Sequence, residues 1–347
     1  MTPSIDRRTF VRGGAALAIA ALTPVPASAK DQLVVATFPG TWNEVHREIL
    51  APYFQKKTNA DVTQTIMLAT DQVAKLAATR GQPPFDVAIL DEGPTLDAVK
   101  QGVLEKYPAA KSAHFNELGP PFRNEWGPAI SMQAIGLAYN PKKVKTAPRS
   151  WDDLWNPAYK GRVGLTALNS SLGMAFIVEL ARLKGGSESN LEPGFLALRT
   201  LLPNVGAISA NLGAHSALIQ QEQVDVAVHN FNFIETLKGK GVEVDWVKPE
   251  TGAPAWRTNL HIVKGAQRPD LAFEYIEGHI TPEVQAAMAK APHFVIPTNR
   301  KVVLSGAIVD KVARTPDELT KLVFHDWTKI NEVRAAAIER FNREIKL

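Results

Sequence analysis

Five short segments of this chain carry the side chains best suited to binding a small molecule. Each is predicted to follow the carboxyl end of a strand or to open a helix, where α/β proteins offer free backbone N–H groups to ligands. The candidates are Thr41, Trp42, Asp91, Glu92, Asn169, Ser170, Ser171, Asn230, Phe231, Trp256 and Arg257. Aromatic rings, hydroxyls, amides and charges of both signs predict a site that binds a ligand without reacting with it.

Each candidate also fits a structural role. Thr41 and the Ser170–Ser171 pair suit helix N-caps, because a hydroxyl there accepts a bond from an orphan backbone N–H. Asp91 and Glu92 suit solvated loop charges. The tryptophans Trp42 and Trp256 stand at loop ends and not on a periodic apolar face, so an aromatic ligand wall is as good an explanation as a core position.

Motifs for covalent or metal chemistry are missing from the sequence. There is no cysteine, no Gly-x-Ser-x-Gly elbow, no His-Glu-x-x-His and no glycine-rich phosphate loop. The five tyrosines are isolated from one another, and His46, His215 and His229 have no metal-ligand spacing. We therefore predict no catalytic residue, no metal ligand and no cofactor. Two alternatives stay open, a ferric-ion binder and a periplasmic hydrolase whose residues assemble from distant positions.

Alternating strand and helix patterns predict the elements that position these segments. The near-continuous apolar run at 85–90 is typical of a buried parallel strand. Strands are predicted at 33–37, 61–67, 85–90, 135–139, 163–165, 205–209, 224–229 and 242–247. Helices are predicted from residue 42 to 57 and at 70–80, 95–101, 172–183, 192–202, 216–222, 232–240, 270–279, 282–290, 319–324 and 326–345. This order predicts an α/β fold with mostly parallel sheets.

Residues 134–165 pack a strand, a turn, a capped helix and a second strand into a short stretch. The strand ends at the Asn140-Pro141 turn, and Ser150 with Asp153 predicts a capping box for the next helix. Trp151 and Trp155 give that helix an apolar face and are predicted to be core residues.

This block resembles the solute-binding proteins of ABC transporters, in particular the spermidine/putrescine-binding branch. The likeness extends to the segments 85–90, 102–107 and 251–260 and covers most of residues 31–345. It implies a two-lobed periplasmic-binding-protein fold of type II, with the ligand cleft between the lobes. Lobe 1 is expected at 30–136 and 255–300, and lobe 2 at 137–254 and 301–347. It also implies hinge closure over the ligand and delivery to an inner-membrane permease.

The chain departs from the polyamine-binding pattern where the ligand charge is recognised. In the family, an aromatic wall lies in the first turn, which Trp42 matches, and the return crossing carries Trp followed by Asp. Here Trp256 is followed by Arg257, and the family's acids at the positions of Asn169 and Ser170 are missing. A guanidinium in place of a carboxylate reverses the charge preference of a site. A zwitterion or organic anion, such as an amino acid, carboxylate or phosphonate, is therefore expected, with polyamine binding as the alternative.

The first 29 residues are predicted to be a twin-arginine signal peptide, from Arg7-Arg8 and the Ala27-Ser28-Ala29 cleavage site. Without the charged residues of this segment, the formal net charge falls from +4 to +2. A nearly neutral chain without a basic cluster is a poor nucleic-acid binder. We expect a soluble periplasmic monomer whose partners are a small-molecule ligand and an ABC transporter permease. Presentation of the ligand to a sensor domain is a further alternative.

Overall fold

The fold is described from a computed structural model, which describes residues 30–79 and 81–346. The predicted signal peptide lies outside these residues, so its twin-arginine pair and cleavage site stay predictions. The strands of the described part are β1 (Gln32–Thr37), β2 (Asp61–Ile66), β3 (Val87–Asp91), β4 (Ala129–Tyr139), β5 (Val163–Thr166), β6 (Val205–Ser209), β7 (Val226–Asn230), β8 (Asp245–Val247), β9 (Pro254–Ile262) and β10 (Val323–Phe324).

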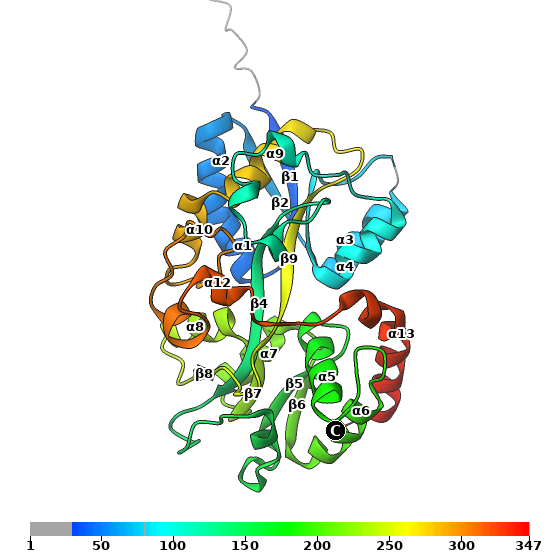
Figure 1. The fold of residues 1–347 in the computed structure, drawn as a ribbon, viewed down its shortest axis with the longest axis vertical. Coiled ribbons are helices and arrows are strands. Elements are labelled where there is room, and N and C mark those ends of the chain that lie inside the picture. The colour runs from blue at the N-terminus through cyan, green and yellow to red at the C-terminus, as the bar shows by residue number, and fades with distance from the viewer. Residues whose placement is uncertain (1–29, 80, 347) are drawn as a thin grey trace, which may run out of the picture. The chain divides into compact units, whose positions relative to one another are not determined.

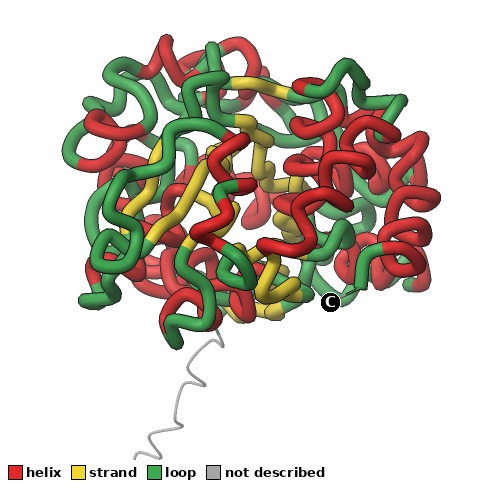
Figure 2. The backbone as a smooth tube through the Cα atoms, turned by 90° about the horizontal axis from the view of Figure 1, so that it is seen from below, coloured by secondary structure: helices red, strands yellow, loops and turns green. Residues whose placement is uncertain are grey.

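The helices account for most of the remaining chain. In order they are α1 (Thr41–Val45), α2 (Ala51–Thr58), α3 (Ala69–Ala78), α4 (Glu92–Gln101), α5 (Ser171–Leu183), α6 (Glu192–Leu201), α7 (Leu212–Gln220), α8 (Phe231–Gly239), α9 (Pro269–His279), α10 (Pro282–Met288), α11 (Ala307–Lys311), α12 (Pro316–Leu319) and α13 (Trp327–Glu344). A π-helical turn at His46–Leu50 joins α1 to α2. Figure 2 shows these helices around the strands, which lie in the interior.

The strands follow the order β2-β1-β3-β9-β4-β7-β5-β6. On one side, β1 pairs in parallel with both β2 and β3, and β9 closes this group antiparallel to β3. On the other side, β5 pairs in parallel with β6 and β7. The predicted α/β class is thus confirmed, with antiparallel β4 and β9 added where the two parallel groups meet.

The long strand β4 belongs to both groups. Its first half pairs with β9 as far as Ala134 opposite Ala255, and from Ile135 opposite Asn230 it pairs with β7. Every residue of β4 except Tyr139 is buried. In Figure 1, β4 and β9 run together through the middle of the ribbon, with β1 and β2 near one end and β5, β6 and β7 near the other. The two-lobed architecture is built on this shared strand, and the residue limits of the lobes stay predictions.

The block at residues 134–165 folds largely as its sequence indicates. Ser150 and Asp153 form the predicted capping box, although the helix they open, Trp151–Trp155, is a 3-10 helix. Trp151 is buried in the core of the second lobe. Trp155 packs against the same core while its indole N–H donates to Thr200 Oγ1 at 2.9 Å.

The predicted helix at 319–324 is wrong in its second half. Helix α12 ends at Leu319, and Val323 and Phe324 form β10, which pairs in parallel with Pro254 and Ala255 of β9. These residues pair with the edge of β9 instead of continuing a helix. The helical spacing of apolar residues in the sequence could not reveal this pairing, because β9 is distant in the chain.

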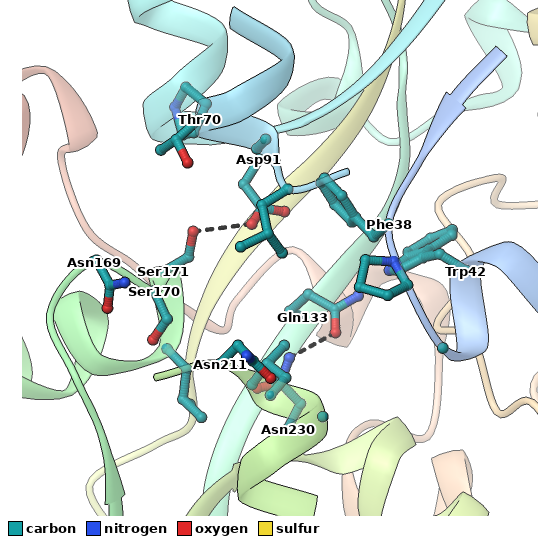
Figure 3. Close-up of a pocket in the computed structure, with 18 of the residues that line it drawn as sticks. Phe38, Trp42, Thr70, Asp91, Gln133, Asn169, Ser170, Ser171, Asn211 and Asn230 are labelled. Atoms are coloured by element: carbon teal, nitrogen blue, oxygen red, sulfur yellow. Dashed lines mark hydrogen bonds between the residues drawn. The ribbon is translucent and has the colours of Figure 1, made fainter. Parts of the chain in front are cut away.

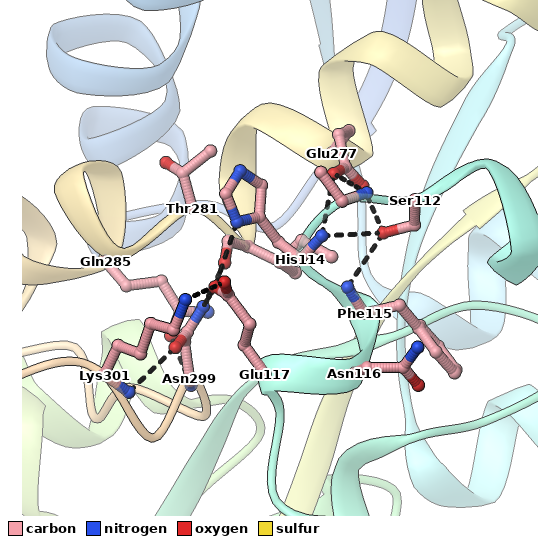
Figure 4. Close-up of polar contacts among 12 residues, drawn as sticks. Ser112, His114, Phe115, Asn116, Glu117, Glu277, Thr281, Gln285, Asn299 and Lys301 are labelled. Carbon is pink, nitrogen blue, oxygen red and sulfur yellow. Dashed lines mark hydrogen bonds and ion pairs between the residues drawn. The ribbon is translucent and has the colours of Figure 1, made fainter.

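The buried carboxylate of Glu277 on α9 accepts hydrogen bonds from the irregular segment 107–114, which follows α4. Figure 4 shows the network around it. One oxygen of Glu277 accepts from Tyr107 Oη at 2.9 Å and Ser112 Oγ at 2.6 Å. The other oxygen accepts from the backbone N–H groups of Ala113 at 2.9 Å and His114 at 3.1 Å. A carboxylate, which only accepts, matches four donors at once.

No helix among residues 30–79 and 81–346 combines the length and apolar character needed to span a bilayer.

Replacing Glu277 by Gln should lower the free energy of unfolding by about 2–3 kcal/mol, because an amide NH₂ would face donors and leave them unpaired. Denaturant unfolding followed by circular dichroism measures this loss. The matched control is Glu339→Gln on α13, where the side chain is 81% exposed. Equal effects of the two substitutions would contradict the proposed anchoring role of Glu277.

Candidate ligand-binding site

A cavity of about 180 Å³ lies where the ends of strands from both lobes meet. Its lining combines an aromatic side, two charged groups of opposite sign and a set of amides and hydroxyls. From the first lobe it is lined by Phe38, Pro39, Gly40, Trp42, Leu68, Ala69, Thr70, Asp91, Pro94 and Gln133. From the second lobe and the strand leading back it is lined by Asn169, Ser170, Ser171, Leu172, Ala210, Asn211, Leu212, Gly213, Asn230, Phe233, Trp256 and Arg334.

The aromatic side of the cavity is supported from behind by a pair of buried histidines. Trp42 lies on α1 and is only 3% exposed. Its ring packs against His46 and His279, with ring centroids 5.9 and 6.2 Å apart. Burial lowers the pKa of His279 to about 4, and burial together with neighbouring His279 lowers the pKa of His46 well below its ordinary value. The two histidines that pack against the Trp42 indole are therefore uncharged at neutral pH.

Asp91 is the carboxylate of the cavity and already joins the two lobes. It follows the last residue of the apolar run in β3, and Figure 3 shows it pointing toward Ser171. Its Oδ2 accepts from Ser171 Oγ at 2.9 Å, and its Oδ1 accepts from Thr258 Oγ1 at 3.1 Å. Burial raises the pKa of Asp91, and hydrogen bonds from Ser171, Thr258 and Trp256 together with the charge of Arg334 oppose that rise.

The loop before α5 presents a helix N-terminus to the cavity. Ser170 is the N-cap, since its Oγ accepts from the backbone N–H of Gly173 at 3.0 Å. Gly173 is required for this tight turn, because a Cβ there would lie 2.4 Å from the carbonyl oxygen of Ala167. Ser170 thus fills its structural role as a cap and still lines the cavity beside Ser171.

Asn230 lines the cavity and carries a buried acceptor that no described residue satisfies. It ends β7, and its Nδ2 donates to Gln133 Oε1 at 2.8 Å, as Figure 3 shows. Its Oδ1 is buried and has no hydrogen-bond partner among the described residues. The indole of Trp256 is buried beside Asp91, and its hydrogen bond helps to lower the pKa of that carboxylate. A ligand donor that reached the Asn230 oxygen would satisfy it.

Four of the predicted site residues lie outside the cavity lining. Arg257 forms an ion pair with Glu92 and stacks on Phe324, with the guanidinium carbon 4.4 Å from the ring centroid. That pairing explains why neither charge faces the cavity. Phe231 is fully buried in the core against Trp246, and Thr41 is the buried first residue of α1, which Gly40 caps.

The cationic group of the cavity is Arg334, on helix α13, which the sequence analysis missed. The helix buries Trp327, Ile330, Arg334, Ala337 and Phe341 on one face. An arginine at a position where the helical period calls for an apolar residue is the signal that could have revealed it.

The cavity does not resemble a metal centre. Within the described ranges no group of three or more His, Asp or Glu side chains is placed to hold a metal ion. The Ser170 hydroxyl donates to Thr166 Oγ1 or the Ala167 carbonyl, and no histidine is among the described lining residues. The arrangement suits non-covalent recognition of a small charged molecule.

The free energy of unfolding should fall as the pH is lowered from 6.5 toward 4. His279 has its pKa depressed to about 4 by burial, so the unfolded chain binds a proton in this window that the folded protein does not. Denaturant titrations across this pH range measure the slope. His279→Phe removes the group and should reduce the fall by about 1–3 kcal/mol. An unchanged slope in the variant would show that His279 is charged in the folded protein or accessible to water.

Comparison with known proteins places the chain in a family. The family model described as bacterial extracellular solute-binding protein matches residues 82–332, more than half of the chain. The spermidine/putrescine-binding periplasmic protein of Escherichia coli is 23% identical over an alignment of 327 residues that covers 88% of this chain and 90% of that protein. A putative 2-aminoethylphosphonate-binding periplasmic protein of Salmonella typhimurium is 24% identical over an alignment of 288 residues that covers 80% of this chain and 82% of that protein.

Solved structures agree on the fold. The periplasmic binding protein AfuA from Actinobacillus pleuropneumoniae, solved with exogenous fructose-6-phosphate bound, superimposes with a TM-score of 0.76 at 22% identity. The match covers 92% of this chain and all of that one. The two-lobed fold and the family resemblance inferred from the sequence are confirmed, and the chain belongs to the family of bacterial extracellular solute-binding proteins.

Proposed function

We propose that this protein is the periplasmic substrate-binding component of an ABC importer. It captures a small charged organic solute between its lobes by hinge closure and delivers it to an inner-membrane permease. The observation that carries this proposal is the cavity itself, which both lobes line and across which Ser171 bonds Asp91 at 2.9 Å. A ligand stabilises a closed form only through contacts that the open form lacks, and a cavity lined from both lobes supplies such contacts.

The ligand we propose is a zwitterion or organic anion of the amino-acid, carboxylate or phosphonate type. The cavity holds one carboxylate and one guanidinium, and the amide and hydroxyl side chains of Asn230 and Ser171 line the same space. The relative named for 2-aminoethylphosphonate binding supports this class. A volume of about 180 Å³ suits a small solute and not a polymer segment.

A polyamine is the second candidate. The relative in Escherichia coli is named for spermidine and putrescine, and the aromatic side at Trp42 with the carboxylate of Asp91 would suit an ammonium. Among the described lining residues Asp91 is the single carboxylate, and it shares the cavity with Arg334. Both features disfavour a di- or trication. Docking of the closed protein on a permease and its monomeric state are further parts of the proposal.

The test of the proposed function is mass spectrometry of solute carried through purification. Protein sprayed under native conditions should be heavier than the denatured chain by the mass of one small molecule. The denatured sample should release that molecule chemically unchanged. A thermal-shift screen of amino acids, phosphonates, carboxylates and polyamines supplies the ligand if none is retained. No retained solute and no shift with any of them, or release of a converted product, would contradict the proposal.

Asn230→Ala should weaken binding of that solute about tenfold, because roughly 1.4 kcal/mol of hydrogen bonding to the buried amide is lost. Isothermal titration calorimetry measures the change. Asn116→Ala is the control, since Asn116 is exposed and does not line the cavity. If the two variants bind equally well, Asn230 does not contact the solute.

A further inference from the structure

Arg334 is a buried cation that forms no contact ion pair with a described residue, and the carboxylates of Asp97 and Asp91 act on it only at longer range. Only 8% of the residue is exposed, and it lines the cavity. Its Nη2 donates to the carbonyl oxygen of Asn169 at 3.4 Å, and no carboxylate of the described residues lies within ion-pair distance. By contrast, Arg257 forms an ion pair with Glu92, and Arg162 forms one with Asp225. A buried charge left unpaired is unfavourable, so this guanidinium needs an anion.

The position of Arg334 is fixed by the packing of α13 on α4. Trp327 is 2% exposed and lies against Gly93, where an added Cβ would stand 2.8 Å from its ring. One turn later Asn331 Nδ2 donates to the carbonyl oxygen of Gly93 at 2.9 Å. Arg334 follows on the same face, and its Nη1 would lie 3.1 Å from that same Cβ. The packing of α13 on α4 therefore holds the Arg334 guanidinium at the cavity.

Two helix N-termini add to the positive potential around Arg334. Gly93 belongs to the first turn of α4, and Asn169 directly precedes Ser170, the N-cap of α5. Both helices are long enough, at 10 and 13 residues, for their N-terminal dipoles to favour an anion. A guanidinium with free N–H donors beside them matches the oxygens of a carboxylate or phosphonate.

Asp91 supplies the opposite charge in the same cavity. Each of its oxygens accepts one hydroxyl bond, from Ser171 and from Thr258, and a carboxylate oxygen has room for a further donor. It is not ion-paired with any described cation. The cavity therefore offers one site for an anionic group and one for an ammonium.

We propose that Arg334 recognises the anionic group of the solute and Asp91 its ammonium, so that the ligand is a small zwitterion such as an aminoalkyl carboxylate or phosphonate. This inference rests on the proposed function and names the ligand class of that same cavity. It replaces Arg257 by Arg334 as the cation that determines specificity.

The first experiment compares probes that differ only in charge. Wild-type protein is titrated calorimetrically with 2-aminoethylphosphonate, with 4-aminobutanoate and with putrescine, the last being the diamine of the same chain length as 4-aminobutanoate. A zwitterion should bind, and putrescine should bind at least thirtyfold more weakly. Arg334→Gln should weaken zwitterion binding at least thirtyfold, and Arg334→Lys by less, because it keeps the charge without the planar fork. Arg343→Gln, on the exposed part of the same helix, should leave binding unchanged.

The second experiment tests the anion site without the natural solute. Inorganic phosphate should raise the melting temperature of the wild type and of Arg343→Gln more than sodium chloride of equal ionic strength does. The extra increase should be lost in Arg334→Gln. Equal responses of Arg334→Gln and the wild type to phosphate would overturn the role of Arg334, whether or not a zwitterion is bound.

The outcomes separate the two proposals. Tight putrescine binding that Arg334→Gln leaves unchanged would overturn the zwitterion assignment and leave the proposed transport function standing. Absence of any retained or added solute would count against the transport function itself, and the phosphate response would still decide the anion site.

Discussion

The change of partner along β4 is the constraint on which the rest of the structure depends. One buried strand pairs with β9 up to Ala134 and with β7 from Ile135 onward, so a single continuous backbone belongs to both lobes. Its backbone hydrogen bonds must be satisfied on both sides of the switch, which fixes where the ends of β3, β7 and β9 meet. Those ends carry Asp91, Asn230 and Trp256 to one cavity.

Charge pairing then decides which residues are free to recognise a ligand. Glu92 and Arg257 neutralise each other beside the cavity, and Phe324 of β10 covers the guanidinium. Asp91 and Arg334 form no contact ion pair with any described residue and attract each other only at longer range. A buried charge that the fold leaves unpaired is a group that a ligand can satisfy, and this cavity holds one of each sign. The buried histidines His46 and His279, which pack against Trp42, add no charge to the cavity at neutral pH.

Most of the fold and about a third of the cavity lining could be predicted from the sequence, for identifiable reasons. Apolar runs such as that of β3 reveal strands, and polar residues directly after them reveal loops at strand ends, which is how Asp91 and Asn230 were found. Arg257 misled because its pairing with Glu92 depends on the register between β3 and β9. Arg334 was missed because α13 reaches the cavity only through its tertiary packing on Gly93.

The central claim is that the solute is held between the lobes by contacts with both. A crystal structure of the protein with its solute bound tests this most directly. We predict density that touches Trp42 and Asp91 on one side and Ser171 and Asn230 on the other, with an anionic group within about 3.2 Å of the Arg334 guanidinium. A solute that contacts only one lobe, or that lies outside this cavity, would contradict it.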